Sequence, residues 1–131
     1  NLIQDHLFVG IFPALQEAGI AALLDPKSEE AVAQLNANYD SRRDAFVQVA
    51  AKIGWKAFPS KGSFYAWMPV PEGYTSESFA DLLLEKAHVA VAPGKGFGPA
   101  GDAYVRIGLL VEPERLVEAV GRIANLQLFN N

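Results

Sequence analysis

The stretch Ala103-Tyr104-Val105-Arg106-Ile107-Gly108-Leu109 alternates strictly between apolar side chains and a second set that contains a phenol, a guanidinium and a glycine. Successive side chains of a strand point to opposite faces, so this alternation predicts a strand over 103–110 with one face in a core. Arg106 then lies on the other face. Its guanidinium could bind a carboxylate through two parallel hydrogen bonds, although a solvated arginine is the simpler interpretation of the pattern alone.

The segments around this strand alternate between helical and strand-like patterns. Apolar residues spaced by three and four predict helices over 13–24, 27–53, 76–88 and 113–126. Aromatic and β-branched runs predict further strands over 55–58, 63–70 and 88–92. The order, without an internal repeat, predicts an α/β fold of the two-layer α+β kind. We expect a small, mostly antiparallel or mixed sheet with helices packed on it, preceded by one long helix.

The helix predicted over 27–53 is long for a domain of this size. At about 1.5 Å per residue it extends about 40 Å, so we expect part of it to reach beyond its own core. Its apolar stripe runs from Val32 to Ile53, and Gly54 is the expected C-terminal cap. Arg42 interrupts the stripe. A solvated or ion-paired arginine is the simple interpretation, and a contact with something beyond the helix's own core is the alternative.

The composition argues against several classes of function. The chain has 131 residues, half of them apolar, which suits one domain with a buried core. It has no cysteine, which excludes disulfides and thiolate chemistry. A net charge of −4 with scattered basic residues argues against nucleic-acid binding. We expect no membrane span, no signal peptide and a cytoplasmic location. Because the chain starts at Asn1 instead of Met, we also expect a piece of a larger enzyme.

The remaining candidates for chemistry are weak. The glycine-rich loop over 93–101 has neither the P-loop spacing nor the dinucleotide-binding fingerprint, so we expect it to place Phe97 against a neighbouring surface. His6 and His88 lack metal-ligand spacing, and no nucleophile motif or carboxylate pair is evident. No catalytic or metal-binding residue is therefore predicted in this chain.

Several segments, in order, resemble the C-terminal small domain of the class I/II pyridoxal-phosphate-dependent aminotransferases, of fold type I and like aspartate aminotransferase. Pro59-Ser60-Lys61-Gly62-Ser63-Phe64-Tyr65-Ala66-Trp67 is similar to the family's P-x-G-x-F-Y-x-W strand. The stretch from Ser78 to Gly94, the Tyr104-Val105-Arg106-Ile107 segment and Asn38 to Asp44 resemble further family motifs. Phe12 to Leu24 is similar to the segment that follows the family's lysine-bearing region.

This resemblance implies roles for particular residues. Arg106 would bind the substrate α-carboxylate, in place of the solvated interpretation, and Phe64 would line the substrate pocket. Residues 1–25 would be a remnant of the large domain that also contributes to a homodimer interface, with the segment around Gly10 to Phe12 near the partner's active site. Residues 26–131 would form the small domain, with 27–53 as the interdomain helix.

The resemblance also implies pyridoxal 5'-phosphate in the parent enzyme, which would transfer an amino group between an amino acid and a 2-oxo acid. The family's Schiff-base lysine belongs to a motif that this chain lacks, and the other cofactor contacts belong to the large domain. We therefore expect no cofactor-binding residue here, no bound cofactor and no activity of this fragment alone.

Two alternatives stay open. One is another fold-type-I enzyme, such as a β-eliminating lyase or an acyl-condensing synthase, because these share the carboxylate arginine. The other is a stand-alone α/β ligand-sensing or interaction domain. An exposed apolar surface along the first twenty-five residues and the long helix would favour the aminotransferase fragment over the stand-alone domain.

Overall fold

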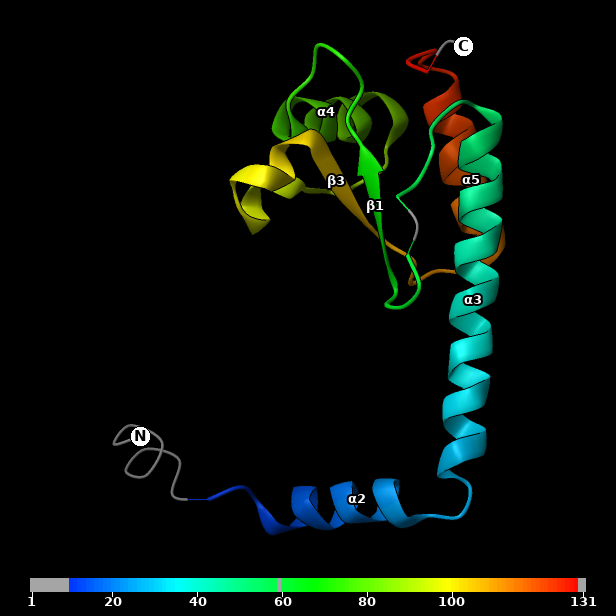
Figure 1. Ribbon diagram of the computed structural model, residues 1–131, viewed down its shortest axis with the longest axis vertical. Coiled ribbons are helices and arrows are strands. Elements are labelled where there is room, and N and C mark those ends of the chain that lie inside the picture. Colours follow the sequence, from blue (N-terminus) through cyan, green and yellow to red (C-terminus); the bar gives the residue numbers. More distant parts are fainter. Residues whose placement is uncertain (1–9, 59, 130–131) are drawn as a thin grey trace. The chain divides into compact units, whose positions relative to one another are not determined.

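The computed structural model describes residues 10–58 and 60–129 (Figure 1). Its internal contacts divide the chain into two compact units, the first ending at Asn36 and the second beginning at Ala37. The predictions for His6 and for the rest of 1–9 lie outside the described residues. None of the described helices combines the length and the apolarity that a membrane crossing requires.

The first unit contains helix α2, Pro13–Leu24, and the start of helix α3, Ser28–Lys52. Pro13 opens α2, where its missing N–H would have no partner, and Asp25 ends the helix in extended backbone. No residue of α2 is buried. The exposed large apolar side chains of this unit are Ile11, Phe12, Leu15, Ile20, Leu23, Leu24, Val32 and Leu35. The predicted exposed apolar surface is thus confirmed for the described residues.

In the second unit, the C-terminal part of α3 packs into the core through Phe46 and Ala50. Arg42, which interrupts the apolar stripe, forms an ion pair with Glu112 at 2.5 Å, so the ion-paired interpretation is the right one. α3 ends at Lys52, and Gly54 follows with a φ of 83°.

The strand predicted over 55–58 is wrong. Trp55 is buried and donates its indole N–H to the carbonyl of Pro69 at 2.8 Å, so it fills the core beside the sheet. The segment makes one ladder-like contact, from the N–H of Phe58 to the carbonyl of Trp67. Trp55 was therefore a sign of burial, which raises apparent β propensity without requiring a strand, whereas Phe58 is exposed.

Strands β1, Tyr65–Pro69, β2, Ala92–Pro93, and β3, Tyr104–Gly108, form an antiparallel sheet in the order β1-β3-β2. The strand predicted over 88–92 is wrong except at Ala92, because β2 contains only Ala92 and Pro93. His88 ends the helical segment in a left-handed conformation with a φ of 55°, and the N–H of Val89 still bonds to the carbonyl of Leu83, so the helix end occupies the start of the predicted strand.

Helices α4, Ser76–Leu82, and α5, Pro113–Ala124, complete the second unit, and a π-helical turn, Leu83–Ala87, extends α4. α4 contacts β2 and β3 (Figure 1). One face of the sheet joins the helices in the hydrophobic core, to which β1 and β3 contribute Ala66, Met68, Val105 and Ile107. The predicted small antiparallel sheet with packed helices and a preceding long helix is confirmed, and so is the alternation of β3.

Candidate functional site

Arg106 lies at the centre of the sheet, on the face opposite the core. It pairs with Trp67 of β1 on one side and with Ala92 of β2 on the other. Its guanidinium carbon lies 4.1 Å from the ring centroid of Tyr65 and 4.1 Å from that of Phe97. Within residues 10–58 and 60–129, no carboxylate forms an ion pair with Arg106 and its side chain makes no hydrogen bond. This cation is therefore held by two aromatic rings and has its N–H donors available.

Phe64, the second predicted site residue, reaches Arg106 only through Tyr65. Its ring centroid is 4.5 Å from that of Tyr65, and its carbonyl accepts a hydrogen bond from the N–H of Leu109 at 2.8 Å. The side chain is 37% exposed, and Tyr39 of α3 packs against it at 5.6 Å between centroids. The structure thus brings both predicted residues into contact with one shared tyrosine.

Phe97 comes from the glycine-rich loop, which folds into two short 3₁₀ turns, Gly94–Phe97 and Pro99–Ala103. The two turns pack backbone against backbone at Gly94 and Gly101. A Cβ at either glycine would collide with a backbone oxygen of the other. The loop therefore needs glycine at both positions for close approach. As expected, it places Phe97 against a neighbouring surface, and that surface includes Arg106 and Trp67.

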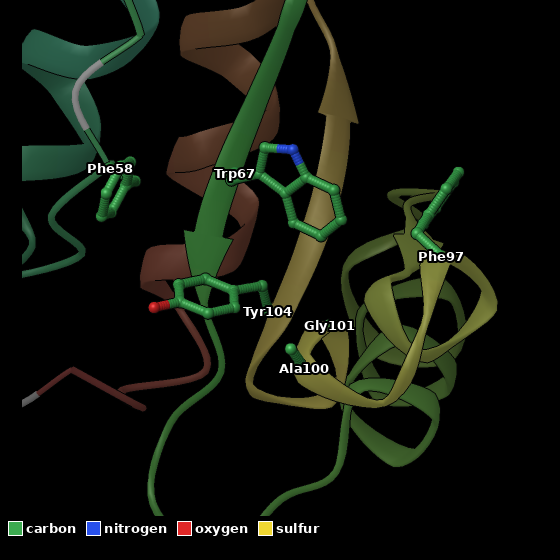
Figure 2. Close-up of a pocket in the computed structure, with 6 residues that line it drawn as sticks. All are labelled: Phe58, Trp67, Phe97, Ala100, Gly101 and Tyr104. Carbon is green, nitrogen blue, oxygen red and sulfur yellow. The ribbon is translucent and has the colours of Figure 1, made fainter.

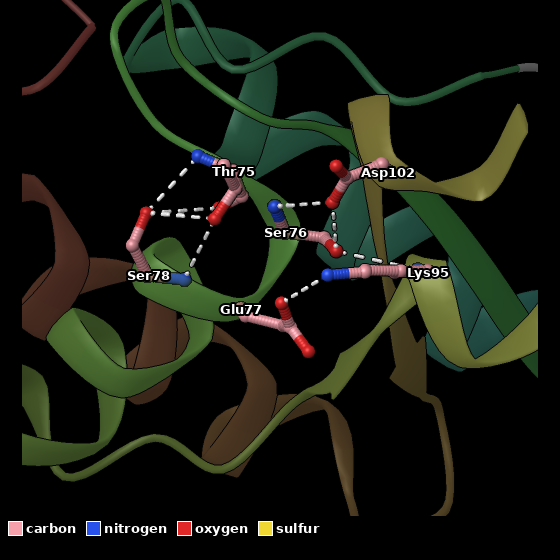
Figure 3. A network of polar contacts seen from close by, with 6 residues as sticks. All are labelled: Thr75, Ser76, Glu77, Ser78, Lys95 and Asp102. Carbon is pink, nitrogen blue, oxygen red and sulfur yellow. Dashed lines mark hydrogen bonds and ion pairs between the residues drawn. The ribbon is translucent and has the colours of Figure 1, made fainter. Parts of the chain in front are cut away.

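A polar network joins this loop to the start of α4 (Figure 3). The hydroxyl of Ser76 donates to Asp102 at 2.7 Å and accepts from the N–H of Lys95 at 3.2 Å, while the N–H of Ser76 donates to Asp102 at 3.1 Å. These bonds from Ser76, the hydroxyl first, lower the pKa of Asp102. The ammonium of Lys95 pairs with Glu77 at 2.7 Å, and this hydrogen bond raises the pKa of Lys95.

An apolar pocket of about 360 Å³ opens on the same face of the sheet (Figure 2). It is lined by Phe58, Trp67, Phe97, Ala100, Gly101 and Tyr104. Trp67 is in edge contact with the rings of both Phe97 and Tyr104. Phe97 therefore belongs both to the wall of this pocket and to the contacts of Arg106.

Tyr65 is not among the predicted site residues, and Phe97 is predicted only as a surface contact. The alternation of residues 63–70 contained a usable signal, because Tyr65 and Trp67 share the face opposite the buried Ala66 and Met68. Their pairing with Arg106 depends on the register of β1 and β3, which the sequence pattern does not fix.

Comparison with known proteins identifies the family to which this chain is similar. The family model described as "Aminotransferase class I and II" matches residues 2–123. The L-glutamine--4-(methylsulfanyl)-2-oxobutanoate aminotransferase of Bacillus subtilis (strain 168) is 57% identical over 129 residues, which are 98% of this chain and 32% of that protein. An LL-diaminopimelate aminotransferase of Moorella thermoacetica is 45% identical over 121 residues, 92% of this chain and 30% of that protein.

Solved structures agree. The structure of substrate-bound BacF from Bacillus subtilis matches with a TM-score of 0.88 at 44% identity, over 98% of this chain and 33% of that one. The chain spans about a third of the length of the relatives it matches. Since the family model covers nearly all of the sequence and the fold agrees over the same range, this chain belongs to the class I and II aminotransferases.

Proposed function

We propose that this chain is the substrate-carboxylate-binding part of a pyridoxal-phosphate-dependent aminotransferase, with Arg106 as the residue that binds the α-carboxylate. The observation that carries the proposal is a half-buried guanidinium on the central strand with no acidic partner among the described residues. A carboxylate is the natural ligand of such a group, because the planar fork of arginine matches its two oxygens.

The position of Arg106 on the central strand would orient the substrate. β3 is paired on both edges, so the backbone of Arg106 is fixed with respect to the rest of the small domain. A substrate bound to it by two parallel hydrogen bonds would keep its α-carbon at a constant place, which lowers the entropic cost of reaching a reactive geometry. Phe64 would add an apolar surface beside Tyr65, which contacts Arg106.

The cofactor would bind elsewhere in the whole protein. Lys95, the lysine of the glycine-rich loop beside the site, is paired with Glu77 and stands 55% exposed, which does not fit a lysine that forms a Schiff base. Pyridoxal phosphate acts as an electron sink when it is bound in such enzymes. We propose that its lysine and its phosphate contacts come from the large domain, and that this chain alone binds no cofactor and is inactive.

The division of the chain is part of the proposal. Residues 1–25 would belong to the large domain and to a homodimer interface, and 26–131 would form the small domain with its connecting helix. The exposed apolar side chains of α2, such as Leu23 at 83% exposure, support this assignment because they need a covering surface. The whole enzyme would be a cytoplasmic homodimer.

The reaction proposed is amino transfer between an amino acid and a 2-oxo acid. The first of the relatives described above is named for glutamine and 4-(methylsulfanyl)-2-oxobutanoate, so this pair is the first to assay with the whole protein. Formation of a 2-oxo acid only when an amino acceptor is present would support transamination. Release of ammonia without an acceptor would instead support a β-eliminating lyase.

The test of the binding residue is Arg106→Ala in the whole protein. Removing one partner of a desolvated charge pair costs about 2–5 kcal/mol, so kcat/KM should fall by about 30- to 5,000-fold, with a higher KM and a lower kcat. Arg115→Ala is the matched control, because this arginine is 67% exposed on α5 and pairs with Glu118. An unchanged kcat/KM in Arg106→Ala would refute the assignment.

A further inference from the structure

We propose that Tyr65 and Phe97 form an aromatic clamp that positions the guanidinium of Arg106 for carboxylate binding. The proposal rests on the proposed function of Arg106 and assigns a role to two residues that the motifs leave without one. The clamp is defined by the two rings, each with its centroid 4.1 Å from the guanidinium carbon. Both are positioning residues, since they act through Arg106.

The geometry of the clamp selects the direction in which Arg106 can donate. The N–H groups of a guanidinium lie in its plane, and a guanidinium stacked on an aromatic ring keeps that plane along the ring. The guanidinium carbon of Arg106 lies over both rings at 4.1 Å, a distance that fits stacking. In a stacked arrangement the two rings cover the faces of the guanidinium, and its in-plane N–H donors stay accessible. A carboxylate also binds in that plane, so the clamp and the substrate do not compete for the same part of Arg106.

Tyr65 reaches Arg106 diagonally across the sheet. Its direct partner on β3 is Gly108, while Arg106 is opposite Trp67. Even a Cβ at position 108 would meet Cε1 of Tyr65 only at 4.0 Å, an ordinary contact distance, so β3 does not crowd the ring. Phe64 packs on Tyr65 at 4.5 Å between centroids and Tyr39 packs on Phe64, and these rings limit the movement of Tyr65.

Phe97 approaches from a segment that is fixed independently of β1. Its turn is anchored by the Gly94–Gly101 contact and by the bonds of Lys95 and Asp102 to Ser76. Ser76 itself is fully buried. Although Phe97 is 52% exposed, its backbone is thus tied to α4 and its ring to Trp67 at 5.6 Å. The clamp is held from two sides by elements far apart in the sequence.

The clamp reduces the entropy that Arg106 loses when a substrate binds. An unrestrained arginine side chain loses rotamer entropy when it is fixed in one geometry. Tyr65 and Phe97 restrict Arg106 before the substrate arrives, so less of this cost falls on binding. The interaction of each ring with the cation, about 2- to 30-fold when it is expressed as an equilibrium constant, favours the conformer of Arg106 that binds the carboxylate.

The test uses the whole protein with its cofactor and two unreactive probes, 4-(methylsulfanyl)butanoate and its neutral amide, measured as competitive inhibitors. Phe97→Leu and Tyr65→Leu keep an apolar side chain but remove the ring. We expect each to weaken the carboxylate about 2- to 30-fold while the amide changes less than about twofold. Tyr65→Phe keeps the ring and should restore wild-type affinity for the carboxylate.

The control is Phe58→Leu. Phe58 lines the same pocket as Phe97 and is 62% exposed, but it makes no contact with Arg106. We expect both probes to bind this variant as they bind the wild type. Should Tyr65→Leu fail to fold, Phe97→Leu decides, because its exposed ring can be replaced without opening the core.

The outcomes separate the clamp from the proposed function. Loss of carboxylate affinity in Arg106→Ala but not in Phe97→Leu or Tyr65→Leu would overturn the clamp and leave the role of Arg106 intact. Equal weakening of acid and amide would also overturn it, because that result indicates a purely structural role. No loss in Arg106→Ala would overturn both.

Discussion

Replacing Gly94 with alanine should damage the site without touching Arg106 directly. A Cβ at this position would collide with the carbonyl oxygen of Gly101, would lie 2.5 Å from that of Tyr104 and 2.9 Å from Cζ3 of Trp67. Two of these neighbours are backbone atoms, so a rotamer change cannot relieve the collision. The turn that carries Phe97 must move instead.

The size of the effect follows from this overpacking, which typically costs about 1–3 kcal/mol. We expect Gly94→Ala to lower the melting temperature of the whole protein and to weaken carboxylate inhibitors about as much as Phe97→Leu does. Thermal unfolding and inhibition constants measure the two effects separately. Gly96→Ala is the matched control, because a Cβ there meets nothing within 4 Å. If the Gly94 and Gly96 variants behaved alike, the close packing of the loop would not be what positions Phe97.

Two further predictions concern the second unit. The hydrogen bonds from Ser76 lower the pKa of Asp102, so its contribution to stability is present above the ordinary carboxyl pKa of 3.8 and is lost as the pH falls through the lowered value. Melting temperatures recorded below about pH 4 should therefore fall less steeply in Asp102→Asn than in the wild type, and parallel curves would contradict this. Trp55→Phe removes the indole hydrogen bond to Pro69 and should destabilise the protein by about 1–3 kcal/mol in thermal unfolding. An unchanged melting temperature would count against a structural role for that bond.

The sequence predicts an element well where the spacing of its apolar residues indicates directly which side chains are buried. The alternation of residues 103–109 places Val105 and Ile107 in the core and Arg106 outside it, as found. The same reasoning failed for residues 55–58, because Trp55 is buried without joining a ladder. An aromatic residue such as Trp55 can indicate burial, and burial does not specify a strand.

The clamp could not be predicted because it depends on strand register and on loop packing. Tyr65 and Arg106 meet only with the register that sets Trp67 opposite Arg106. A shift of one residue would turn Tyr65 towards the core. The position of Phe97 depends on backbone contacts between Gly94 and Gly101, which periodicity does not report.

The outward row of β3 shows how a small sheet can combine stability with binding. Val105 and Ile107 pack in the core on the inner face, so the residues on the outer face do not have to be apolar. There, Tyr104 lines the pocket, Arg106 supplies the charge and Gly108 lies opposite Tyr65. One strand can thus provide both core packing and a charged site, because its alternation assigns the two roles to different residues.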